Sequence, residues 1–157
     1  MIERRVADKI DAALLRNLIA DPDMTHLALA EAAGLARNTV RARLTRYKDE
    51  KSLFSFQSRI DPAFLGFPLR AYVVTRVTQR KLTSVGEALA AIPEVIEVCG
   101  LSGITDLLVQ VVARDADDLY RVAGSILSIK GVKRTSTGLV MRELVSYRIE
   151  QLIEKTG

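Results

Sequence analysis

The sequence is poor in the residues that build disulfide frameworks and metal sites. Its 157 residues include one cysteine, Cys99, one histidine, His26, and no tryptophan. A single cysteine excludes an intrachain disulfide, and a reducing cytoplasm is the compartment that suits such a chain. No spacing of Cys and His supports a metal site. We therefore expect no metal and no cofactor.

Long apolar runs and common catalytic motifs are also missing. No run reaches the ~18 apolar residues that a transmembrane helix needs, so we expect no membrane partner. The first residues are charged and lack the apolar core of a signal peptide. The sequence contains no GxSxG, no GxxxxGK[ST] and no dinucleotide fingerprint, and we expect no enzymatic activity. With 48% hydrophobic residues, the chain can fold into one or two packed cores.

Positive charge is concentrated in one short segment. Residues 37–51 hold six basic residues against two acidic ones, so their net charge equals the +4 of the whole chain. A local basic segment on an otherwise balanced protein favours contact with a polyanion. A solvated helix face would explain the composition equally well.

Apolar spacing predicts three helices before residue 50. The first spans residues 8–20, the second is capped by Thr25 and ended by Gly34, and the third carries Val40, Leu44 and Tyr47 on one face. Small and apolar residues at Ala30, Gly34 and Val40 are typical of a helix-turn-helix, which inserts the start of its second helix into the major groove. An ordinary helical hairpin with a basic surface is the alternative. The predicted DNA contacts are Thr25, Arg37, Asn38, Thr39, Arg41, Arg43 and Arg46.

Residues 52–60 alternate between apolar and polar side chains, which predicts a half-buried strand. With it the first domain, residues 1–59, would be a winged helix-turn-helix. Asp61-Pro62 and Gly66-Phe67-Pro68 then predict a hinge over residues 60–68.

The second half of the chain has a pattern of strands and helices instead of helices alone. Strands are expected at 69–77, 95–100, 107–112 and 132–141. One helix should open at a capping box of Ser84 and Glu87 and end near Pro93, and another should follow Asp115. The order βαββαβ predicts an α+β, ferredoxin-like domain over residues 69–157, with residues 144–157 as a closing strand or helix. The helices would cover only one face of this sheet, and we expect a second subunit to cover the other face.

A glycine turn in this domain is the candidate small-molecule site. Backbone N–H groups near Gly103 suit a carboxylate, Asp106 offers a counter-charge for an ammonium group, and threonine hydroxyls could complete a site for a zwitterion. A tight turn with a capping Asp beside β-favouring threonines is the alternative. The predicted small-molecule site comprises Gly100, Leu101, Ser102, Gly103, Ile104, Thr105, Asp106, Thr135 and Thr137.

Five segments of the sequence, in the same order along the chain, resemble the Lrp/AsnC, or feast/famine, family of transcriptional regulators. Residues 10–21 are similar to its first helix, 29–44 to its helix-turn-helix, and 60–66 to its hinge. Residues 103–108 and 132–137 are similar to its effector-domain turn and last strand. The chain departs from the family at Ala36, where serine is usual, and at Lys51, where glycine is usual.

The resemblance implies a regulator that binds double-stranded DNA and works in the cytoplasm in association with the nucleoid. It also implies an amino-acid effector near Gly103, Asp106 and Thr137, and a homodimer that can assemble into octamers. Two other functions remain open. One is an architectural protein that wraps DNA without an effector. The other is a tetrapyrrole decarboxylase of the same fold, which would need histidines that the second domain lacks.

Overall fold

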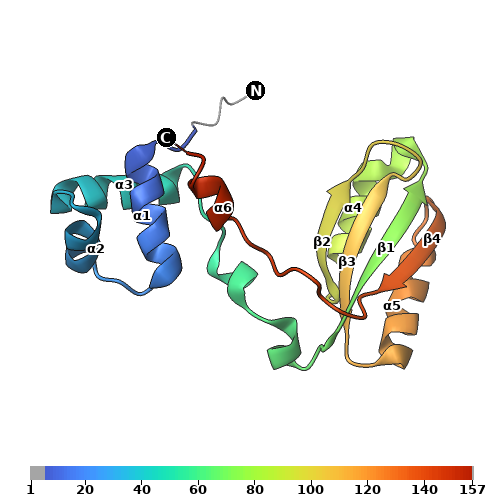
Figure 1. Ribbon diagram of the computed structural model, residues 1–157. Helices are drawn as coiled ribbons and strands as arrows, with labels where there is room; N and C mark the ends of the chain where they lie inside the picture. Colours follow the sequence, from blue (N-terminus) through green and yellow to red (C-terminus); the bar gives the residue numbers. More distant parts are fainter. Residues whose placement is uncertain (1–5, 157) are drawn as a thin grey trace. The chain divides into compact units, whose positions relative to one another are not determined.

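The computed structural model describes residues 6–156, which divide into two compact units (Figure 1). The first unit contains residues 6–58 together with residues 145–156, and the second is Arg59–Leu144. The predicted division gave residues 69–157 to one domain. The C-terminal segment belongs instead with the first unit, because its short helix α6 (Glu150–Ile153) contacts α1 and buries Ile153.

The first unit is built on α1 (Lys9–Ala20), α2 (His26–Ala33) and α3 (Arg37–Asp49). Leu14, Leu29 and Val40 are fully buried and join the three helices into one small core. The predicted caps are confirmed. The Thr25 hydroxyl accepts a hydrogen bond from the Ala28 N–H at 3.2 Å, and Gly34 ends α2 with a φ of +66°. Glycine suits that position because it has no Cβ to clash in the left-handed region.

The predicted strand at residues 52–60 is wrong. The segment is irregular, ends in a single 3₁₀ turn at Phe56–Arg59, and is exposed throughout. A second 3₁₀ turn, Pro62–Leu65, follows. Alternating side chains describe which face of a strand could be buried, but a strand also needs a neighbour for its backbone hydrogen bonds. No such neighbour pairs with this segment among residues 6–156, so the helix-turn-helix has no wing strand here.

The second unit is the predicted βαββαβ domain. Its strands β1 (Leu69–Val77), β2 (Val95–Gly100), β3 (Leu107–Ala113) and β4 (Val132–Leu139) form an antiparallel sheet in the order β2-β3-β1-β4. Helices α4 (Leu82–Ala90) and α5 (Ala116–Leu127) pack on one face (Figure 1). The buried side chains Val73, Val109 and Ile126 mark the core between sheet and helices.

The two helices of the second unit, α4 and α5, begin differently from one another. Asp115 caps α5 as expected, accepting a hydrogen bond from the Asp118 N–H at 2.8 Å. The capping box predicted at Ser84 is wrong, because α4 already begins at Leu82 and the Ser84 hydroxyl donates to the Lys81 carbonyl. A serine inside a helix can satisfy its hydroxyl on a preceding carbonyl instead of capping.

Alternation along β1 separates the two faces of the sheet. Ala71, Val73 and Thr75 are completely buried under the helices, while Tyr72 and Val74 point to the opposite face and remain partly accessible. Paired residues in an antiparallel sheet share a face. Leu108 and Ser136, the partners of Val74, therefore also lie on this open face.

Candidate DNA interface and effector site

The N-terminal half of α3 presents three of the predicted DNA-contacting side chains to solvent. Val40 and Tyr47 are buried seven residues apart, and this fixes which side of α3 faces the core. Arg37, Asn38 and Arg41 are exposed and line a hollow of about 440 Å³ together with His26 of α2. The hollow has no acidic lining, and its side chains are hydrogen-bond donors suited to phosphate and base edges.

Arg43 lies on the other side of α3 and is held inside the unit. Its Nη1 donates to Asp8 Oδ2 at 2.6 Å and to Asp11 Oδ1 at 2.8 Å. Arg46 Nη2 reaches the same Asp11 oxygen at 3.1 Å, and the Tyr47 hydroxyl donates to it at 2.7 Å. The Asp11 side chain is 4% exposed. This carboxylate thus ties the start of α1 to the second half of α3.

The local sequence explains why Asp11 is placed so accurately. Asp8 and Asp11 form a reciprocal cap at the start of α1, in which each backbone N–H donates to the other's carboxylate at 3.0 Å. Burial alone would raise the pKa of Asp11, but the hydrogen bonds from Asp8, Tyr47 and Arg43 outweigh it and lower that pKa. Hydrogen bonds to Asp8 and Asp11 raise the pKa of Arg43. Burial, followed by the bond to Asp11, raises the pKa of Tyr47.

The remaining predicted DNA contacts, Thr25 and Thr39, are engaged or partly buried within the first unit. Thr25 is exposed but its hydroxyl already caps α2, and Thr39 is partly buried beside Val40. Ala36 stands at the N-cap of α3 with no side-chain hydrogen bond, as its methyl group requires. Sequence reasoning missed the Asp8–Asp11 pair. The D-x-x-D spacing before an apolar helix was the available signal for that pair.

The turn between β2 and β3 displays unused backbone donors. Leu101 N–H bonds to the Asp106 carbonyl at 2.8 Å, which closes the turn, and Gly103 adopts a φ of +116° at its tip. Among residues 6–156, no backbone carbonyl accepts a hydrogen bond from the N–H groups of residues 102–105. Ile104 is 85% exposed. Backbone N–H groups without an acceptor in a glycine turn suit an anion.

Asp106 performs a structural task within the same turn. Its Oδ2 accepts from the Val77 N–H at 2.8 Å, and its Oδ1 accepts from Gln79 Nε2 at 2.7 Å. Its own N–H donates to the Thr75 carbonyl at 3.0 Å. Asp106 therefore fixes the turn against the end of β1.

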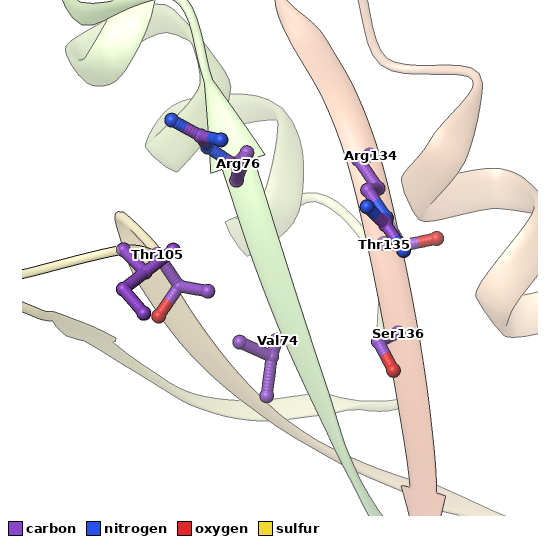
Figure 2. A pocket seen from close by; sticks show the side chains of 7 residues that line it. Val74, Arg76, Thr105, Arg134, Thr135 and Ser136 are labelled. Carbon is purple, nitrogen blue, oxygen red and sulfur yellow. The ribbon is translucent and has the colours of Figure 1, made fainter.

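Beside this turn lies a hollow of about 190 Å³ on the open face of the sheet. It brings the predicted Thr105 and Thr135 together with residues that sequence reasoning did not select, Arg76, Arg134 and Ser136 (Figure 2). Ile104 and Val74 complete the lining. Thr137 is not part of this lining. Thr135 and Thr137 pair with the buried Thr75 and Val73, so both side chains leave the sheet on the helix-covered side, although Thr135 borders the hollow.

The described residues form neither a metal site nor a membrane span. No group of three or more His, Cys, Asp or Glu side chains in residues 6–156 is arranged to hold a metal ion. No helix in that range is long and apolar enough to cross a membrane.

Comparison with known proteins matches both units to models of the same family. Residues 8–48 match the AsnC-type helix-turn-helix domain, and residues 70–149 match the Lrp/AsnC ligand binding domain. The HTH-type transcriptional regulator AldR of Mycolicibacterium smegmatis is 30% identical over 147 residues, which span 91% of this chain and 86% of AldR.

Solved structures share the fold over nearly the whole chain. E. coli AsnC superposes with a TM-score of 0.82 at 20% identity, covering 93% of this chain and 99% of AsnC. The feast or famine regulatory protein of M. tuberculosis, complexed with L-methionine, gives a TM-score of 0.78 at 26% identity, covering 92% and 98%. The chain belongs to the Lrp/AsnC family of DNA-binding transcription regulators.

Proposed function

We propose that this protein is a sequence-specific regulator whose DNA affinity or assembly is changed by an amino acid. One observation carries the proposal: the chain joins an outward row of Arg37, Asn38 and Arg41 to a second unit with free N–H donors at residues 102–105. The first feature suits a duplex and the second suits a carboxylate. The L-methionine bound to the M. tuberculosis relative supports an amino acid as the ligand class.

For DNA recognition, we propose that Arg37, Asn38 and Arg41 make the base and phosphate contacts, with His26 at the edge of the same hollow. Arg43 and Arg46 instead orient α3, because their guanidinium groups are engaged by Asp11. Arg reads guanine and Asn reads adenine through paired hydrogen bonds, so this row can discriminate sequence as well as hold the backbone.

For the effector, we propose the hollow between the Gly103 turn and β4. The N–H groups of the turn would receive the carboxylate of the ligand. Asp106 would act as a positioning residue, since both of its carboxylate oxygens already hold the end of β1. Thr105 and Ser136 would add hydroxyl contacts from two sides.

For assembly, we propose a homodimer formed through the open face of the sheet. Tyr72, Val74 and Leu108 are partly accessible there, on the side opposite α4 and α5. A second copy would cover this surface by two-fold symmetry, and dimers could associate further.

Two successive measurements test the function. A thermal-shift screen of the twenty amino acids on the full chain identifies a stabilising ligand, and a mobility-shift titration with and without that ligand follows. We expect the ligand to change the apparent DNA affinity or the size of the complex. DNA binding that no amino acid affects would favour an architectural DNA-wrapping protein, whereas absence of any duplex binding would refute the proposal.

A further inference from the structure

Two arginines occupy opposed positions on neighbouring strands and line the hollow beside the Gly103 turn. Arg76 of β1 and Arg134 of β4 are direct partners in the antiparallel register, so both side chains leave the sheet on the same face. Both are exposed, and both line the hollow of about 190 Å³. In Figure 2 the guanidinium groups stand apart, one on each strand.

Like charges at directly opposed positions destabilise an antiparallel pair. No carboxylate among residues 6–156 forms an ion pair with either arginine, and the lining of the hollow contains no acidic residue. The neighbouring Asp106 directs its two oxygens to Val77 N–H and Gln79 instead. The sheet therefore keeps two uncompensated positive charges beside the turn whose free N–H groups also favour an anion.

We infer that the effector is anionic: a small dicarboxylate, such as an acidic amino acid, whose second carboxylate binds between Arg76 and Arg134. This inference rests on the proposed effector site and adds the chemical class of its ligand. The turn at residues 102–105 would take one carboxylate and the arginine pair the other. Guanidinium groups bind carboxylates through paired, charge-assisted hydrogen bonds, which distinguish a carboxylate from an amide of the same shape.

The test uses calorimetry on the full chain with two probes of matched shape, L-glutamate and L-glutamine, and with L-methionine as a reference whose side chain is uncharged. We expect L-glutamate to bind at least about tenfold more tightly than L-glutamine, because only its side-chain carboxylate makes charge-assisted hydrogen bonds to the guanidinium groups. A tenfold difference in affinity corresponds to about 1.4 kcal/mol. Replacing both arginines, in the variant Arg76→Gln/Arg134→Gln, should remove this preference. The variant Arg142→Gln, which loses one exposed charge of the same unit outside the hollow, should keep it.

The outcomes separate this inference from the proposed function. If L-methionine or L-glutamine binds as well as L-glutamate, the effector site stands and the anionic class is refuted. If no amino acid binds at all, the proposed effector function fails and the inference fails with it. Light scattering covers a third case. Should Arg76→Gln/Arg134→Gln dissociate an assembled protein, the arginines serve an acidic group of a second copy, and the ligand role is refuted.

Discussion

Arg43 of α3 donates to Asp11 of α1 across 2.8 Å, while Arg41, two residues earlier, points into solvent. Two neighbouring arginines of one helix thus have different surroundings. A helix turns 100° per residue, so a two-residue step moves a side chain to nearly the opposite side. The basic segment seen in the sequence is therefore divided between internal ion pairs and an exposed row.

The first prediction separates these roles. Arg43→Ala should lower the free energy of unfolding by about 3 kcal/mol, because it leaves the buried Asp11 carboxylate without its main charged partner. Arg41→Ala should change stability by less than about 0.5 kcal/mol but weaken DNA binding and reduce the salt slope by about one. Urea unfolding and mobility-shift titrations at several salt concentrations measure both. Equal loss of stability in the two variants would contradict this division.

Stability in acid should depend on Asp11. Its folded-state pKa lies below the ordinary value of 3.8, so its contribution is fully present above pH 3.8 and is lost as the pH falls through the lower folded pKa. The free energy of unfolding should therefore decline below about pH 4. Urea titrations from pH 2 to 6 follow the decline, and Asp11→Asn should flatten it. An unchanged slope in that variant would assign the acid sensitivity to other carboxylates.

Two glycines with nearly the same φ form a matched pair. Gly131 and Gly103 have φ values of +118° and +116°. A Cβ on Gly131 would approach Lys81 Cβ at 3.0 Å, whereas one on Gly103 would meet open space. Both alanine variants carry backbone strain of about 1–3 kcal/mol. Gly131→Ala should be the less stable of the two in thermal unfolding, and equal stability would show that Lys81 and Val85 move aside at no cost.

The proposed dimer predicts the effect of a charge on the open face. Leu108→Lys places an ammonium group among Val74 and its neighbours and should shift the protein toward monomer at micromolar concentration, since an unpaired charge at an interface core is costly to bury. Leu127→Lys is the control, because Leu127 of α5 is 50% exposed outside the sheet. Multi-angle light scattering measures the mass. A stable monomer in the unchanged protein would refute the dimer itself.

Periodic patterns predicted the helices well, because a helix makes its backbone hydrogen bonds within its own segment, and they also predicted the four strands of the second unit. The helix ended by Gly34, the cap at Asp115 and the βαββαβ order are all confirmed. The strand at residues 52–60 failed because its hydrogen bonds would need a second strand, and none of the described residues provides one. Ser84 failed because a serine can bond backward to a carbonyl within a helix that has already begun.

The candidate sites divide in the same way. The exposure of Arg41 and the turn at Gly103 could be predicted because helix spacing and turn chemistry are local properties; their roles in binding stay predictions. The pairing of Arg43 with Asp11, 32 residues away, could not be predicted. Neither could the pairing of Arg76 with Arg134, which lie on strands that are distant in the sequence.

By itself the sequence determined the element order, the helix-turn-helix and the basic segment, because these follow from residue type and spacing along the chain. Tertiary structure alone decided which arginines face solvent and which pair with Asp11, and it brought Arg134 beside Arg76 at the Gly103 turn. The physical reason is that charge pairing and burial depend on what folds against a side chain. That neighbour is set by strand register and helix packing.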